Sequence, residues 1–303
     1  MSAPTASVDG AAVRVGAVAR VEAAHRRRLR ARRWARLGGG AVLLAALAVS
    51  AWVSEAWPGA ILAGLPRVGD YFAKLVPDLR WGVLFAGSET EGSLAYWMYR
   101  LDAWLWLLFE TGQMAALATL AGAAVALPLC FPAAANLAPN RAISLLTRRG
   151  LEACRTVPDL VYALILVWAF GVGPLAGILA IAVHSAGSLG KLFAEAAENA
   201  DPRPLEAVRA AGGGWAQGMR YAVLPQVLPN LLSYALLRFE INLRSASVIG
   251  FVGAGGIGQE LYTTISLGYY QEIGALLVLI VLAVCLVDLA SERLRHAAIG
   301  RAR

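Results

Sequence analysis

The chain has 303 residues, of which 58% are hydrophobic, and its formal net charge is +7 at pH 7. Soluble globular domains are usually about 45–50% apolar, so this composition excludes an ordinary soluble globule and indicates a membrane protein. The three cysteines, Cys130, Cys154 and Cys285, are scattered along the chain. Their spacing predicts neither a metal site nor a disulfide framework.

Residues 1–36 form a basic N-terminal arm that contains nine arginines. Such an arm could bind nucleic acid, but the apolar run that begins at Leu37 favours a simpler interpretation, because basic flanks of spans stay cytoplasmic. We predict a first transmembrane helix over residues 37–57. No small-residue cleavage site closely follows the run, so we expect a retained span rather than a cleaved signal.

Residues 58–110 follow as a segment on the outer side of the membrane. This segment is rich in Trp and Tyr, whose amphipathic rings favour the headgroup layer. We therefore predict an interfacial helix lying on the outer surface, with a small folded external domain as the alternative.

Residues 111–292 are predicted to form the core, with five further transmembrane helices. The apolar windows in this range are Thr111–Asn140, Leu160–Gly190, Val227–Gly250 and Ile273–Val287. The window of 31 residues from Leu160 to Gly190 is too long for one upright span, and Gly171, Gly173 and Pro174 mark a break in it. With two passes there, 21 of the 27 basic residues lie in cytoplasmic segments. The charge distribution thus predicts an all-α membrane protein of six helices with both termini cytoplasmic, ending in a basic tail over residues 293–303.

The cytoplasmic loop 191–225 contains a polar stretch that glycines interrupt. Leu205, Val208 and Ala211 recur at helical spacing, and three glycines from Gly212 then stop the helix. A second short helix is expected over Trp215–Val223, before Leu224-Pro225 bends the chain back into the membrane. Two short helices at a sharp angle form a knob that suits a cleft on a partner protein.

The pattern Glu206-Ala207-Val208, then Gly212, then Leu224-Pro225 resembles the EAA loop of permeases in binding-protein-dependent ABC importers. In that family the loop is the coupling helix that docks into the ATPase subunit. The resemblance implies that coupling to the ATPase involves the residues Glu206, Ala207, Gly212, Leu224 and Pro225. The chain departs from the pattern at Val208, where the family has a second Ala, and at Ala222, where it usually has Ile.

A wider resemblance, from about Gly64 to Leu294 and densest from Leu151, is to the phosphonate importer permease within that family. It implies a MetI-like permease fold, a homodimer, a cytoplasmic ABC ATPase dimer, a solute-binding protein and a bacterial inner membrane location. No catalytic residue, metal, cofactor or nucleic acid is expected, and the chain is not expected to be an enzyme. The stretch GSETEGSLAYWMYRLDAW looks like extra outside sequence relative to the family.

The fifth span carries charges that the bilayer would not tolerate on its lipid face. We expect a translocation path lined by Arg238, Glu240, Asn242, Arg244 and Ser247. Glu240 and Arg244 are four residues apart and are predicted to pair, which leaves Arg238 as a net positive charge for an anion. The alternative is a structural ion-pair network that holds the spans together. His184 is expected to be a packing or interface residue.

Gly253, Gly255, Gly256 and Gly258 fit the letters of a dinucleotide-binding motif. A charged span precedes them rather than a strand, so we predict close packing or a tight bend at an outer gate. Gln259 and Glu260 are weaker candidates for contacts with the solute-binding protein. The stretch GSLGKL, residues 187–192, lacks the first glycine and the Ser or Thr of a phosphate-binding loop, so ATP hydrolysis is assigned to another subunit.

Two alternatives to a phosphonate permease stay open. One is an ABC permease for another small solute, such as phosphite, a phosphate ester or methionine. The other is a secondary transporter driven by an ion gradient, with Glu240 or Asp288 as the carrier. That mechanism predicts matched half-repeats with interrupted spans, and the sequence shows none.

Overall fold

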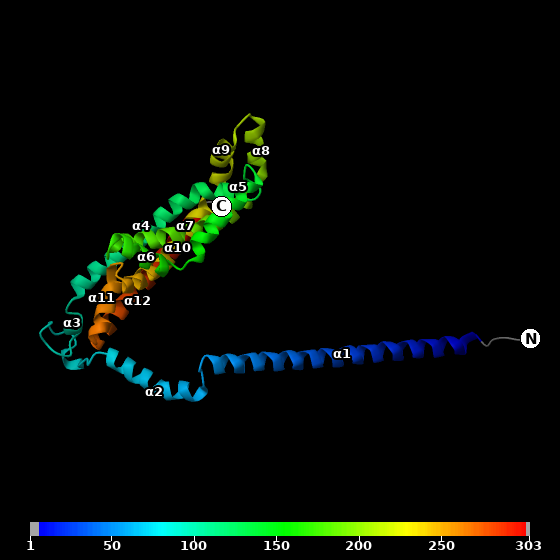
Figure 1. Cartoon of the computed structure of the whole chain (residues 1–303), viewed down its shortest axis with the longest axis horizontal. Coiled ribbons are helices and arrows are strands. Elements are labelled where there is room, and N and C mark those ends of the chain that lie inside the picture. Colours follow the sequence, from blue (N-terminus) through cyan, green and yellow to red (C-terminus); the bar gives the residue numbers. More distant parts are fainter. Residues whose placement is uncertain (1–5, 301–303) are drawn as a thin grey trace, which may run out of the picture. The chain divides into compact units, whose positions relative to one another are not determined.

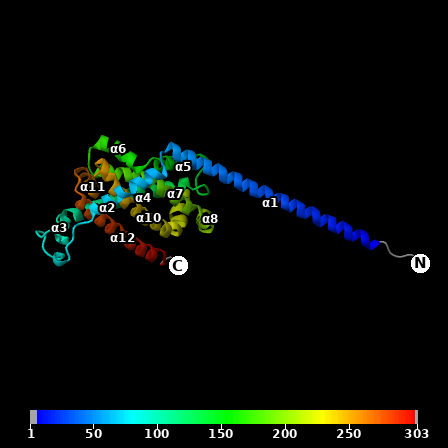
Figure 2. The same ribbon diagram turned by 90° about the horizontal axis from the view of Figure 1, so that it is seen from below.

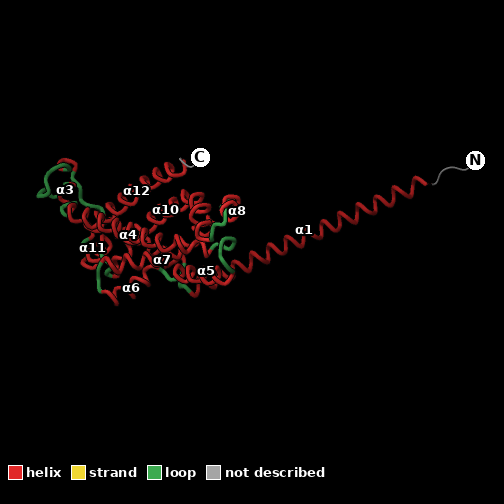
Figure 3. The backbone as a smooth tube through the Cα atoms, turned by 90° about the horizontal axis from the view of Figure 1, so that it is seen from above, coloured by secondary structure: helices red, strands yellow, loops and turns green. Residues whose placement is uncertain are grey.

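The computed structural model describes residues 6–300 of the chain. Within that range every regular element is helical and no strand occurs, which agrees with the predicted all-α class (Figure 3). The chain divides after Phe72 into two compact units.

The first unit holds α1 (Ala6–Val53) and most of α2 (Pro58–Leu75). Helix α1 runs without a break from the basic arm into the apolar run (Figure 1). Its part Arg32–Val53 is long and apolar enough to cross a membrane, a few residues earlier than the predicted span. In α2, Ile61, Leu65 and Val68 recur at the spacing of one helix face, as an interfacial helix requires.

The second unit is a helical bundle with a short hairpin at one end (Figures 1 and 2). Its helices are α3 (Leu94–Trp97), α4 (Leu101–Ala133), α5 (Arg141–Thr156), α6 (Asp159–Phe170), α7 (Pro174–Glu198), α8 (Pro202–Ala210), α9 (Trp215–Gln217), α10 (Leu224–Ile249), α11 (Gly256–Leu267) and α12 (Tyr270–Gly300). The predicted break at Gly171–Pro174 is confirmed as a break between helices, because α6 ends at Phe170 and α7 begins at Pro174.

Four helical segments of the described chain are long and apolar enough to cross a membrane: Arg32–Val53, α4, α7 and most of α12. Helices α5 and α6, bent by 83° at their junction, raise this number to five if they form one broken span. Helix α10 is not among them, because Arg238, Glu240 and Arg244 lower its hydropathy. The number of six spans therefore stays a prediction.

Helix α4 begins at Leu101, before the predicted start of the span at Thr111. The charge-free window excludes residues 101–110, about three turns of helix, because of Asp102 and Glu110. The chain nevertheless continues as helix there, since Trp104 is fully buried with Leu276 and Ile257 in the core that α4 shares with α11 and α12.

Helix α7 lies at the centre of the bundle and packs against α4, α5, α6 and α10. Its small residues allow this close approach. A Cβ atom on Gly187 would lie 2.5 Å from the Leu151 carbonyl oxygen of α5, and one on Gly190 would lie 2.6 Å from Leu151 Cδ2. The stretch GSLGKL is thus part of a continuous packed helix and has no loop that could surround a phosphate.

The hairpin of α8 and α9 lies at one end of the bundle, and α3 and α11 lie at the other (Figures 1 and 2). The core follows the same axis in three clusters of buried side chains. One contains Phe131, Leu205 and Met219 near the hairpin, a second contains Ile181 and Leu243 in the middle, and the third surrounds Trp104 near α3.

Candidate functional site

The α8–α9 hairpin, residues 201–223, begins with a helix cap. The Asp201 side chain accepts a hydrogen bond from the Arg203 backbone N–H at 3.0 Å, and Pro202 occupies the first turn. The Arg203 guanidinium also donates to this carboxylate at 2.8 Å and lowers the pKa of Asp201. The cap fixes the point at which the chain leaves α7 and enters the hairpin.

The hairpin turns at glycines, as the sequence predicts. Helix α8 ends at Ala210, and Gly212 follows with φ of 83°, a conformation that side chains disfavour. The second short helix differs from the prediction. Its residues Gly218–Val223 form a π-helical turn that continues into α10, so the helical backbone is not interrupted at Leu224-Pro225.

Polar side chains attach the hairpin to the bundle. The Trp215 indole N–H donates to the Leu137 carbonyl oxygen at 2.6 Å, which joins the hairpin to the loop between α4 and α5. Gln226 of α10 accepts from the Asp201 backbone N–H at 2.9 Å. Glu198, at the end of α7, accepts from the Ala135 backbone N–H at 2.6 Å. The hairpin is therefore held to the bundle at its first residue, Asp201, and at the start of α9, Trp215.

The predicted coupling residues lie mostly on the surface of the hairpin. Glu206, Ala207, Gly212 and Pro225 are exposed, while Leu224 is partly buried. The two departures from the EAA pattern lie on the inner side, because Ala222 is buried in the hairpin core and Val208 packs against that core. They therefore leave the exposed face unchanged.

A buried polar cluster connects three helices in the middle of the bundle. The Asn242 amide of α10 donates to Thr119 Oγ1 of α4 at 2.8 Å and to Ser185 Oγ of α7 at 2.9 Å. Arg238 Nε donates to the same Ser185 oxygen at 3.1 Å. No carboxylate of the described residues lies within ion-pair distance of Arg238. The cluster thus contains an unpaired guanidinium.

Arg244 pairs with Asp288 of α12 at 3.0 Å, and the predicted pairing of Arg244 with Glu240 is wrong. Residues four apart on a helix can pair, but α12 packs directly against α10 and brings a carboxylate to Arg244 from outside the helix. Glu240 Oε1 is buried without a hydrogen-bond partner among the described residues.

The predicted path residues therefore lie on different sides of α10. Asn242 has no exposed surface in this chain, and Arg238 and Ser247 are each only 9% exposed. The Arg244 side chain is 52% exposed. Ser247 lines an apolar groove of about 500 Å³ between α4, α10 and α12, together with Leu105, Phe239 and Val287.

The glycines after α10 form a turn at which several elements meet. Gly253, Gly255 and Gly256 all have positive φ values between 70° and 82°. The Gly253 carbonyl oxygen accepts from the Gly173 backbone N–H at 2.9 Å, and the Ile257 N–H donates to Thr111 Oγ1 at 2.9 Å. A helix rather than a strand precedes this turn, so its glycines serve packing and bending.

Three contacts in these sites were not anticipated from the sequence: Trp215 with Leu137, Ser185 with Asn242, and Asp288 with Arg244. Each joins residues at least 44 positions apart, and no local pattern indicates which distant helix lies opposite. The one sequence feature that indicates the buried cluster is the presence of polar side chains inside apolar windows, as at Thr119 and Ser185. His184, by contrast, contacts the Val157 carbonyl oxygen at 3.0 Å, as expected for a packing residue.

Comparison with known proteins gives consistent matches. The family model described as "Binding-protein-dependent transport system inner membrane component" matches residues 126–301. The phosphite transport system permease protein PtxC of Stutzerimonas stutzeri is 37% identical over 86% of this chain and 89% of its own length. The phosphate-import permease protein PhnE of Mycolicibacterium smegmatis is 37% identical over 77% of this chain and 41% of its own length.

Two further matches extend this result. A relative named for phosphonate transport, PhnE2 of Escherichia coli K12, is 49% identical over 39% of this chain and 97% of its own length. A chain of the inward-facing MetNI methionine ABC transporter superposes on 66% of this chain and 97% of its own length, with a TM-score of 0.58 and 23% identity. The structural match shows the fold alone.

Proposed function

This chain belongs to the binding-protein-dependent transport system inner membrane components, the permease subunits of ABC importers, and we propose that its solute is a phosphonate or phosphite. The observation that carries the proposal is the identity of 37% with a phosphite permease across 86% of the chain. The chemistry is consistent, because these anions carry one to two negative charges and guanidinium groups bind such oxygens well. A phosphate ester or methionine is the alternative solute.

The α8–α9 hairpin is proposed to couple the permease to a separate ATPase subunit. Its exposed surface carries Glu206, Ala207 and Gly212, while Leu205 anchors the inner side in the core. An exposed, internally packed knob is the shape that inserts into a groove on a partner. One hairpin per chain and two ATPase subunits per transporter imply a homodimer.

The proposed topology places the hairpin, the basic arm and the C-terminal tail in the cytoplasm of a bacterial inner membrane. Six helices span this membrane in the proposed topology, and α10 is the fifth of them. Helices α3 and α11 then lie on the outer side, where they face the solute-binding protein. Helices α4, α7 and α12 run toward the hairpin, and α10 runs away from it, which supports alternating directions (Figures 1 and 2). The predicted boundaries at residues 36, 57, 110 and 292 are retained as part of this proposal.

The translocation path is proposed to follow α10 where two copies of the chain meet. Leu237, Ile241, Arg244 and Val248 recur at helical spacing and are all exposed in the single chain. An apolar stripe that carries one arginine suits an anion path between protein halves better than a lipid contact. The turn at Gly253–Gly258 is proposed as the outer gate.

Uptake by the complete importer tests the function. Proteoliposomes that contain this chain, its ATPase and its solute-binding protein should accumulate labelled methylphosphonate or phosphite only with internal ATP. A proton or sodium gradient without ATP should have no effect, and uptake driven by such a gradient would overturn the proposal in favour of a secondary transporter.

Gly212→Val should insert normally and lose most uptake, because valine disfavours the positive φ needed at the hairpin turn.

A pair of charge variants tests the role of Arg244. Arg244→Ala should raise the half-saturating anion concentration about tenfold, since a positive charge on the path is worth about 1.4 kcal/mol or more. Asp288→Asn frees Arg244 from its partner and should leave this concentration unchanged or lower it. Uptake kinetics measure both variants. Equal losses would instead assign the Arg244–Asp288 pair to helix packing.

A further inference from the structure

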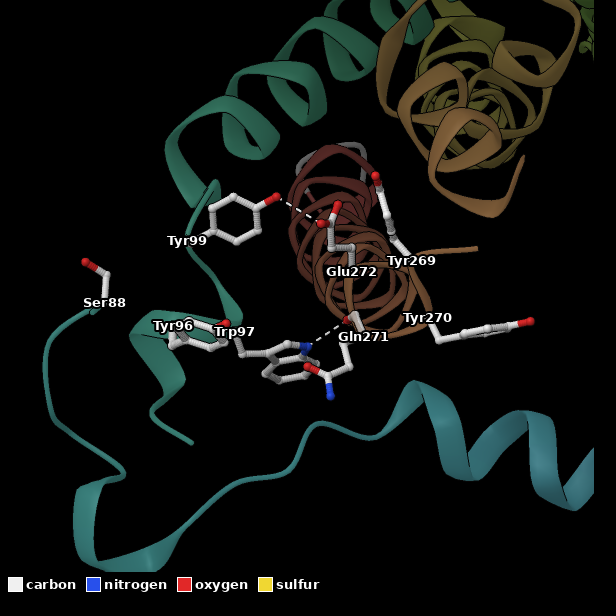
Figure 4. A pocket seen from close by; sticks show the side chains of 8 residues that line it. All are labelled: Ser88, Tyr96, Trp97, Tyr99, Tyr269, Tyr270, Gln271 and Glu272. Atoms are coloured by element: carbon white, nitrogen blue, oxygen red, sulfur yellow. Dashed lines mark hydrogen bonds between the residues drawn. The ribbon is translucent and has the colours of Figure 1, made fainter. Parts of the chain in front are cut away.

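A pocket of about 480 Å³ (Figure 4) lies beside α3, at the end of the bundle opposite the hairpin (Figure 1). It forms where the segment before α4 meets the start of α12. Five of its eight lining residues are aromatic, and Glu272 is the one charged residue among them: Ser88, Tyr96, Trp97, Tyr99, Tyr269, Tyr270, Gln271 and Glu272.

The walls of this pocket are fixed by hydrogen bonds between the two segments. The Tyr99 hydroxyl donates to Glu272 Oε1 at 2.9 Å, and the Trp97 indole N–H donates to the Gln271 carbonyl oxygen at 2.8 Å (Figure 4). Burial and then the bond to Glu272 raise the pKa of Tyr99, so its hydroxyl remains a donor. Arg100 is bound to Glu260 at 2.6 Å and does not neutralise Glu272.

Aromatic faces beside a carboxylate form the environment that binds an organic cation. The rings are accessible, since Tyr96, Tyr99 and Tyr269 are 42%, 53% and 52% exposed. The neighbouring Lys74 ammonium already lies 5.2 Å from the centre of the Tyr270 ring, although Lys74 does not line this pocket. Aromatic rings at this end of the molecule therefore contact a cation within the chain itself.

The charge of this end of the protein agrees with a cationic partner. Residues 73–102 and 253–272 together contain six acidic and three basic residues, whereas the whole chain carries a net charge of +7. An acidic surface on a basic protein attracts a basic partner and repels an acidic one.

We propose that this aromatic pocket receives a lysine or arginine side chain of the solute-binding protein. The proposal rests on the proposed function, which places this end of the bundle outside the membrane. The basic side chain enters between the rings of Tyr96, Trp97 and Tyr269, and its charge meets Glu272. The pocket is formed partly by the segment that resembles an insertion in the family, so it gives this importer its own docking contact.

The test measures ATPase activity of the reconstituted importer against the concentration of solute-binding protein. Glu272→Gln keeps an acceptor for Tyr99 and removes the charge. It should raise the half-saturating concentration of binding protein about tenfold while the maximal rate is unchanged, because a desolvated charge contact at a docking site is worth about that factor. Glu89→Gln, on the segment before α4 but outside the pocket lining, is the matched control and should change this concentration less than about twofold.

A small cation provides a second readout that does not depend on transport. Butylguanidinium should bind the purified wild-type chain in detergent and not the Glu272→Gln variant, and it should compete with the solute-binding protein. Equal behaviour of the Glu272→Gln and Glu89→Gln variants would overturn the proposal. An effect of Glu272→Gln that follows the phosphatidylethanolamine content of the vesicles, and not the binding protein, would overturn it in favour of a lipid headgroup. If the wild-type importer showed no response to binding protein while butylguanidinium still bound, the proposed function would fail rather than the pocket.

Discussion

Replacing Gly258 with alanine should destabilise the bundle by about 3 kcal/mol or more. The Cβ atom of an alanine there would overlap the carbonyl oxygen of Ser247, which is backbone and cannot rotate away. Gly258 lies in the first turn of α11 and packs directly on the end of α10. Relief would require the two helices to separate, at a cost of about 3 kcal/mol or more.

The measurement is the yield of monodisperse protein in detergent and its apparent Tm by size-exclusion chromatography after heating. A loss of about 3 kcal/mol corresponds to a decrease of about 6 °C or more. Gly112→Ala is the control, because Gly112 lies within α4 and has no atom within 4 Å of the position of its Cβ. That variant should be neutral or slightly stabilised. A Gly258→Ala protein as stable as the control would contradict the close approach of α10 and α11.

Asn242→Ala should destabilise the chain by about 2–4 kcal/mol, since it leaves a cavity and removes hydrogen bonds from buried hydroxyl groups. Asn242 is fully buried and bonds to Thr119 of α4 and Ser185 of α7. Ser185 would retain only Arg238 as a partner in the cluster. The apparent Tm in detergent measures the effect.

Asn230→Ala is the matched control, because Asn230 is exposed on the same helix and should tolerate the change. The double variant Ser185→Ala with Asn242→Ala should lose less than the sum of the single variants, since the two side chains bond to each other. The opposite result, unchanged stability with reduced uptake, would place Asn242 on the translocation path instead of between helices.

Much of the helical organisation follows from local sequence patterns. The break at Gly171–Pro174, the start of α8 at Pro202 and its stop before Gly212 all depend on glycine and proline, whose backbone preferences act within a few residues. The family could likewise be identified, because the EAA pattern and the residues after Leu151 are contiguous in sequence. The family match confirms this identification.

The contacts between helices could not be predicted in the same way. Glu240 and Arg244 satisfy the spacing rule for an ion pair, yet Asp288 is the partner because α12 packs against α10. Helix α4 extends N-terminal to the predicted span start at Thr111, because the burial of Trp104 in the tertiary core, which charge along the sequence does not reveal, keeps this segment helical. Hairpin attachment through Trp215 depends on the position of the loop after α4, which only the tertiary fold determines.

The unbroken backbone from the hairpin into α10 has a mechanical consequence. The π-helical turn at Gly218–Val223 joins α10 without an intervening loop, and α10 has 26 residues. At 1.5 Å per residue, a helix of that size is a rod about 39 Å long. Tilting such a rod by about 5° at its base displaces its tip by about 3 Å, comparable to the helix movements of known switching proteins. A small displacement of the hairpin is thereby magnified at the glycine turn at the opposite end of α10.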